Sequence, residues 1–122
     1  MNNILFYDTE TSGKADFTAP PDALHQPHLL QLAAIMTDRE GTEIAKIKTL
    51  IRPEGWEVSP QAFEVHGIST EFAKENGIPL TVALKMFDEL MGLSIGQVCH
   101  NSDFDSRIMT GERIRTGINA NP

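Results

Sequence analysis

Cysteine and long apolar runs are scarce in this 122-residue chain, which has a single cysteine, Cys99, and 40% hydrophobic residues. One cysteine excludes an internal disulfide framework. No apolar run approaches the roughly 20 residues that a membrane-spanning helix needs. The first residues, MNNILFYD, lack the basic region and the cleavage site of a signal peptide. We therefore expect a soluble, cytoplasmic protein without a membrane partner, folded as one domain over residues 1–122.

Basic side chains are also scarce, since 10 Lys and Arg stand against 17 Asp and Glu, for a formal net charge of −7. Surfaces that bind phosphate backbones collect Lys and Arg, so this balance argues against tight, sequence-independent binding of duplex nucleic acid. It does not exclude an enzyme that holds a few terminal nucleotides through metal ions, because bound cations reverse the local electric field.

Hydrophobic patterns predict strands in the first part of the chain and helices in the second. Strands are predicted at Ile4 to Glu10, at 28–38 and at 42–52, with an exposed, proline-containing loop between the first two. A buried strand is predicted in SIGQVCHN, residues 94–101.

Helix start signals follow the third predicted strand. Ser59 and Ser69 are predicted to cap two short helices, and Pro79 to open a longer one that ends near Gly92. A last helix is predicted from Asp103 to about Arg115. Three strands, helices, a strand and a helix predict an α/β domain with a mixed β-sheet.

Two acids, Asp8 and Glu10, lie at the end of the first predicted strand, in FYDTETSG. Side chains two positions apart on a strand point to the same face, with Cα atoms roughly 6.5 to 7 Å apart. Adjacent carboxylates repel each other unless they are protonated, exposed or bridged by a cation, and Mg²⁺ prefers carboxylate, water and phosphate oxygens. The alternative interpretation is an ordinary polar strand end followed by a turn at 11–13.

A third acid, Asp105, follows the last predicted strand in CHNSDFDSRIM. Ligands of open α/β sheets gather at strand ends, so Asp105 can reach Asp8 and Glu10 if the two strands are neighbours. The alternative is that Asp103 and Asp105 only complement the dipole of the helix that they begin.

A zinc site is a competing hypothesis for the histidines and the cysteine. We do not favour it, because two adjacent ligands combined with a His-x-x-His pair is poor zinc spacing. The candidate ligands are His25, His28, Cys99 and His100.

Three blocks, FYDTETSG, SPQAFEVHGIS and HNSDFDSRIM, occur in an order and at a spacing that closely resemble the DEDD superfamily of 3′–5′ exonucleases. This superfamily includes the proofreading subunit of replicative polymerases, RNase T and related phage enzymes, all with a ribonuclease H-like fold. The resemblance covers roughly residues 3 to 112, and three blocks are far more specific than one.

The resemblance implies a metal-dependent enzyme that removes nucleotides from nucleic-acid 3′ ends by two-metal phosphodiester hydrolysis. The implied cofactors are two Mg²⁺ or Mn²⁺ ions, and the implied partners are single-stranded 3′ ends, with a polymerase or a second copy of the chain as a further partner. DNA is favoured over RNA, but the sequence does not choose between them, because recognition of the 2′-OH depends on pocket contacts. Carried over residue by residue, the resemblance makes Asp8, Glu10 and Asp105 the catalytic metal ligands, with Asp8 as the bridging ligand.

Substrate-binding residues are also implied by the resemblance. Thr11 and Gly13 match positions that line the terminal-nucleotide pocket of the family, where a small residue lets backbone N–H groups approach the nucleotide. His66 matches a family signature, and we expect it near the substrate or supporting its loop, the alternative being a histidine hydrogen-bonded into its turn. Asn101 is expected to contact substrate, and Phe104 to belong to the core.

The third motif of the family, which supplies a fourth carboxylate in His-x4-Asp or Tyr-x3-Asp, is missing after Asp105. Only SRIMTGERIRTGINANP follows, with no His, Tyr or Asp, and Glu112 is a weak substitute. We therefore expect an incomplete domain that lacks the C-terminal part of the family fold. The alternative function is an inactive exonuclease-like module that binds nucleic-acid ends or a protein partner.

Overall fold

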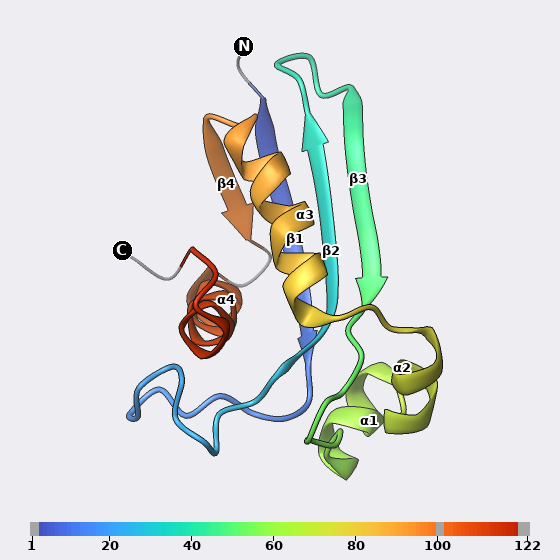
Figure 1. Ribbon diagram of the computed structural model, residues 1–122. Helices are drawn as coiled ribbons and strands as arrows, with labels where there is room; N and C mark the ends of the chain where they lie inside the picture. Colours follow the sequence, from blue (N-terminus) through green and yellow to red (C-terminus); the bar gives the residue numbers. More distant parts are fainter. Residues whose placement is uncertain (1–2, 100–101, 120–122) are drawn as a thin grey trace.

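The structure, a computed structural model, describes residues 3–99 and 102–119 (Figure 1). All eight predicted elements are present, with ends that differ from the predicted ones by a few residues. The strands are β1 (Ile4–Thr11), β2 (Leu29–Thr37), β3 (Glu43–Leu50) and β4 (Gly96–Cys99). The helices are α1 (Pro60–His66), α2 (Thr70–Asn76), α3 (Leu80–Gly92) and α4 (Ser102–Thr116).

The strands form one four-stranded sheet in the order β3-β2-β1-β4. β2 runs antiparallel to both β1 and β3, and β4 runs parallel to β1, pairing Tyr7 with Cys99. The α/β class and the mixed sheet are confirmed. Because β4 is the parallel neighbour of β1, both strands end at the same edge of the sheet, and the chain enters α4 there.

Helix α3 lies across one face of the sheet (Figure 1). The side chains of β1 alternate, so that Leu5 and Tyr7 are buried against α3 while Phe6 is exposed. The Tyr7 and Phe87 rings meet edge to face with their centroids 5.0 Å apart. The buried positions of α3 recur every three or four residues, as an amphipathic helix on a sheet requires; they are Ala83, Leu84, Phe87 and Leu90. In the part of the chain that the structure describes, no helix is long and apolar enough to cross a membrane.

The two short helices begin at the predicted capping residues. Ser59 Oγ accepts a hydrogen bond from the Ala62 N–H at 3.1 Å, and Ser69 Oγ accepts one from the Phe72 N–H at 3.0 Å. Gly67 ends α1 with φ 72°, a left-handed conformation that glycine adopts without strain. The caps fix where α1 begins and ends, and thereby hold α1 beside the end of β1, where the Ser59 N–H donates to Ser12 O at 2.8 Å.

Candidate active site

Asp8 and Glu10 leave β1 on one side of the strand, as the alternation predicts. Asp8 is exposed and Glu10 is half-buried, whereas Thr9 and Thr11 between and after them are buried on the other side. The Asp8 Oδ1 atom accepts a hydrogen bond from the Thr9 N–H at 3.0 Å. The strand therefore presents two carboxylates at its C-terminal end, close to the edge where β4 also ends.

Asp105 is brought to the same strand from α4. Its side chain is 1% exposed, and its Oδ1 atom accepts hydrogen bonds from Thr9 Oγ1 at 2.6 Å and from the Thr9 N–H at 3.3 Å. The Thr9 N–H thus faces one oxygen of Asp8 at 3.0 Å and one oxygen of Asp105 at 3.3 Å. The two carboxylates therefore approach each other at this N–H group. Asp105 does more than complement a helix dipole, because it meets the Asp8 end of β1.

The three acids do not form a closed cage. Asp105 approaches β1 from the buried side through Thr9, while Asp8 and Glu10 point away on the other side. Among residues 3–99 and 102–119, no three His, Cys, Asp or Glu side chains are grouped to hold a metal ion. The end of β1 therefore has carboxylates on two sides, and these do not form one closed group.

The free oxygens of this strand end suit a hard divalent cation. Within the described residues, the Thr9 N–H is the hydrogen-bond partner of the Asp8 carboxylate, and no hydrogen bond or ion pair to the Glu10 carboxylate is seen. Mg²⁺ and Mn²⁺ take carboxylate oxygens and water and keep open positions for phosphate. The donor set of Asp8 and Glu10 fits such ions.

A cavity of about 560 Å³ lies beside Glu10, between the end of β1, α1 and the first turn of α4. Thr11, Gly13 and His66, the three described residues predicted near substrate, all line this cavity together with Glu10. Phe104, predicted as a core residue, is half-buried, packs against the core and also lines the cavity, so the core prediction is incomplete. Asn101 lies outside the described residues.

His66 is hydrogen-bonded at both ring nitrogens. Its Nδ1 atom accepts from the Ile68 N–H at 3.1 Å, so in the neutral ring the proton is on Nε2, which lies 3.0 Å from Thr11 O and donates to it. The same residue therefore closes the turn after α1 and holds the end of β1. His66 therefore both supports its turn and lines the cavity.

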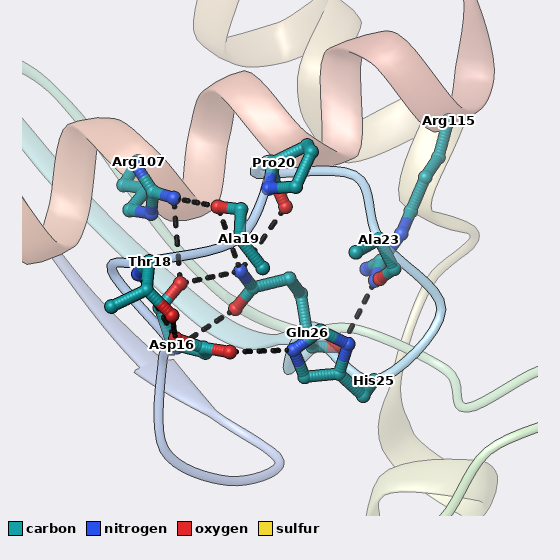
Figure 2. Close-up of polar contacts among 9 residues, drawn as sticks. All are labelled: Asp16, Thr18, Ala19, Pro20, Ala23, His25, Gln26, Arg107 and Arg115. Carbon is teal, nitrogen blue, oxygen red and sulfur yellow. Dashed lines mark hydrogen bonds and ion pairs between the residues drawn. The ribbon is translucent and has the colours of Figure 1, made fainter.

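The segment 13–28, predicted as an exposed loop, is a loop whose side chains are partly exposed and whose backbone is held against α4 (Figure 2). Within it, the buried Gln26 side chain accepts from the Asp16 N–H at 2.9 Å and donates to Asp16 O at 2.7 Å and to Pro20 O at 3.1 Å. Hydrogen bonds from Thr18 and then from His25 hold the pKa of the exposed Asp16 carboxyl at about 2. The loop is thus an ordered part of the site.

Two arginines of α4 reach into this loop (Figure 2). Arg107 donates to Asp16 O at 3.4 Å and to Ala19 O, and Arg115 donates to Ala23 O at 2.8 Å and to Gln26 O at 2.9 Å. Sequence reasoning missed both residues, because an arginine on a helix gives no local signal that its partners are carbonyl oxygens 88 to 92 positions away. The loop residues Lys14 and Phe17, which line the cavity of Glu10, were missed for the same reason.

Glu112, expected to be only a weak substitute for the missing fourth carboxylate, is committed to other contacts in the structure. Its side chain is 1% exposed and already bonded, with Oε2 accepting from the Leu29 N–H at 3.0 Å and Oε1 from Arg115 Nη1 at 3.0 Å. Burial alone would raise the pKa of Glu112, but hydrogen bonding by His28, by the Leu29 N–H and by Arg115 outweighs it and lowers that pKa. His28 Nδ1 lies 3.7 Å from Glu112 Oε2 and 3.1 Å from Arg115 Nη1.

The competing zinc hypothesis has no support in the described residues. His25 Nε2 lies 2.8 Å from Asp16 Oδ2, whereas the His28 ring stacks on Trp56 with centroids 4.8 Å apart. The two histidines thus contact different residues. His100 lies outside the described residues, and no described trio of ligands is grouped around a common point.

We predict that Gly111→Ala destabilises the fold, because a Cβ at Gly111 would lie 2.3 Å from Pro21 O in the loop held against α4. The clash should lower the free energy of unfolding by about 1 to 3 kcal/mol, as overpacking does. The matched control is Gly92→Ala in α3, where a Cβ meets no heavy atom within 4 Å and alanine should be neutral or stabilising by up to ~1 kcal/mol. Urea denaturation of both variants measures this, and a Gly111→Ala variant as stable as Gly92→Ala would contradict the packing of the loop on α4.

A family model and several solved structures match this chain. A family model described as “Exonuclease”, RNase T, matches residues 5–119. E. coli exonuclease I in complex with a 5cy-dA13 oligonucleotide matches with a TM-score of 0.80 at 23% identity, over 94% of this chain and 24% of that chain. Its complex with a dT13 oligonucleotide matches with a TM-score of 0.79 at 23% identity, over the same shares of the two chains. Exonuclease I from Methylocaldum szegediense matches with a TM-score of 0.78 at 23% identity, over 94% of this chain and 24% of that chain.

These structures establish the fold, which is ribonuclease H-like as predicted. The chain spans 24% of the length of the exonuclease I chains that it matches. A comparison with curated protein sequences gave no match. The family match includes all three sequence blocks and both strand ends of the candidate site, and the chain belongs to the RNase T-type exonuclease family of the DEDD superfamily.

Proposed function

We propose that this chain carries the metal-binding acids and the terminal-nucleotide pocket of a 3′–5′ exonuclease that acts on single-stranded DNA. The observation that carries the proposal is the cavity of about 560 Å³ that begins at Glu10 and is lined by Thr11, Gly13 and His66. A nucleotide in this cavity would lie directly beside the strand end at which Asp8 and Asp105 share the Thr9 N–H.

Asp8 and Glu10 would hold divalent cations on the open side of β1, and Asp105 would complete the set from α4. When bound, such ions supply a hydroxide at neutral pH and stabilise the leaving 3′ oxygen. Thr9 keeps Asp105 in place by donating two hydrogen bonds to its Oδ1 atom. Asp105 therefore has one oriented oxygen before any substrate arrives, which reduces the reorganisation needed on binding.

His66 would hold the pocket rather than transfer protons. Both of its ring nitrogens are occupied by backbone groups, at Thr11 O and at the Ile68 N–H. Thr11 in turn donates from Oγ1 to Gly13 O at 2.8 Å, which shapes the turn that forms the cavity wall. The chain of contacts from His66 through Thr11 to Gly13 gives the terminal nucleotide a rigid surface.

Single-stranded DNA is the substrate class that the comparisons support. The E. coli exonuclease I structures are complexes with dT13 and dA16 oligonucleotides, and the net charge of −7 disfavours broad contacts with duplex phosphates. The cytoplasmic location and a polymerase or second-copy partner stay predictions.

A second candidate function is an exonuclease-like module that binds single-stranded ends with little turnover. It is favoured by one specific observation, the commitment of Glu112, the one acidic residue among the described positions 106–119, to Leu29 and Arg115. Loss of a general base typically reduces the rate by ~10² to 10⁴.

The two candidates differ in the turnover of the 122-residue chain. We expect weak binding of Mn²⁺ and slow release of mononucleotides from the 3′ end of a single-stranded oligonucleotide labelled at its 5′ end. Mononucleotide release from the 5′ end would contradict the proposed direction. Turnover of several per second, by protein free of contaminating nuclease, would show that a fourth carboxylate from this chain is dispensable and would overturn the second candidate.

A further inference from the structure

Phe17 is a large apolar side chain that is exposed to solvent, although hydrogen bonds hold the loop around it. It is 57% exposed, and it lines both the cavity of Glu10 and a second cavity of about 350 Å³ that Asp103, Ser106 and Arg107 also line. Phe17 therefore stands at the boundary between the candidate nucleotide pocket and the neighbouring surface of α4. Single exposed apolar residues are common on protein surfaces and need no explanation. An exposed aromatic side chain between two cavities is different, because a ligand in either cavity can contact it.

The Phe17 ring is supported from one side. The Arg107 guanidinium carbon lies 5.5 Å from the ring centroid, a cation–π arrangement, and Arg107 is itself held by Asp16 O and Ala19 O. Gln26 bridges the same stretch through Asp16 and Pro20. The backbone on both sides of Phe17 is thus fixed, so little further ordering is needed when a ligand covers the ring.

The cavity beside Phe17 combines apolar walls with a single cation. Phe104, Val65 and Ala62 supply apolar surface, and Lys14 brings a positive charge close to Glu10. This combination suits a nucleotide, whose base stacks on aromatic rings and whose phosphate is attracted to a lysine. Lys14 thus places a positive charge at this cavity, although the net charge of the chain is −7.

We propose that Phe17 is a base-stacking residue, on which the base adjacent to the terminal nucleotide of a single strand lies. The inference rests on the proposed function and extends it, since it assigns a second subsite outside Thr11, Gly13 and His66. Stacking on an aromatic ring does not depend on base identity, so the subsite would hold single strands of any sequence. A duplex keeps its bases stacked on each other and would gain nothing from Phe17.

The test is binding of a single-stranded DNA oligonucleotide with 2-aminopurine at the position next to the 3′ end, in Ca²⁺ to prevent hydrolysis. Wild-type protein is expected to quench the 2-aminopurine fluorescence. Phe17→Leu should bind about 5- to 100-fold more weakly, the range that one stacked base contributes, and should lose the quenching. Phe17→Trp should restore both.

The matched control is Phe72→Leu on α2, because Phe72 is 54% exposed and lines neither the cavity of Glu10 nor the second cavity. It should bind and quench as the wild type does. Equal affinity and quenching in Phe17→Leu and Phe72→Leu would overturn the stacking subsite and leave the proposed function standing. No binding of the oligonucleotide by any variant, wild type included, would overturn both.

Discussion

Asp8→Asn is expected to reduce Mn²⁺-dependent release of 3′ mononucleotides by on the order of 10³-fold or more, because each bound metal contributes several kcal/mol of transition-state stabilisation. Asp8 presents its carboxylate on the open side of β1, where the Thr9 N–H is its hydrogen-bond partner among the described residues. The neutral amide keeps the size and the hydrogen bond of the carboxylate but loses its charge. Mononucleotide release is measured at high protein concentration in Mn²⁺, and Mn²⁺ affinity by calorimetry.

The Asp8→Asn substitution should not destabilise the fold. Removing one of two neighbouring acids relieves repulsion, so the melting temperature should stay the same or rise. The control is Glu43→Gln, an exposed acid on β3 that lies away from the site and should change neither activity nor Mn²⁺ affinity. Asp8→Asn with wild-type release and wild-type Mn²⁺ affinity would end the assignment of Asp8 as a metal ligand.

The second large effect is expected for stability, in Glu112→Gln. Glu112 is buried and joins β2 to α4 through the Leu29 N–H and Arg115, so its loss leaves the Arg115 charge without its carboxylate. Breaking a buried ion pair by removing one partner typically costs about 3 to 5 kcal/mol. The Arg115 hydrogen bonds to Ala23 O and Gln26 O reduce this cost, so the lower end is expected. Urea denaturation at pH 7 measures the difference.

The stability lost in Glu112→Gln should depend on pH. The pKa of Glu112 is lowered from its ordinary value of 4.5 in the folded protein, so its carboxylate contributes stability above that value and loses the contribution as the pH falls through the folded-state pKa. The wild type and Glu112→Gln should therefore differ most at neutral pH and converge in acid. Glu89→Gln, on the exposed side of α3, is the control and should match the wild type throughout. A constant difference from pH 7 to acid would show that packing, not charge, explains the loss.

The elements of the fold could be predicted because their signals are local. Alternating burial along β1 follows from the two-residue period of a strand, and the capping serines Ser59 and Ser69 act on N–H groups three residues away. The pairing of Asp8 with Glu10 on one side of β1 follows from the same period. The approach of Asp105 to Asp8 and Glu10 was conditional on the last strand lying beside the first, and the sheet order, with β4 next to β1, meets that condition.

The contacts that hold the site together could not be predicted, because they join residues that are far apart in the chain. Thr9 and Asp105 are 96 positions apart, and the backbone of Leu29 and the side chain of Glu112 are 83 apart. No local pattern distinguishes a carboxylate aimed at a metal from one buried against a backbone N–H, so the contacts of Glu112 with Leu29 and Arg115 could not be predicted from the sequence.

The sequence by itself determined the strands, the helix starts and the family, since periodicity, capping and motif spacing depend only on residues close together in the chain. The tertiary structure decided which acids remain open to a cation, because burial and hydrogen bonding by Thr9, Leu29 and Arg115 depend on how α4 packs beside β1 and β2. It also decided that loop residues between Gly13 and Phe17 line the cavity, since donors on Gln26 and on α4 hold the carbonyl oxygens of the loop.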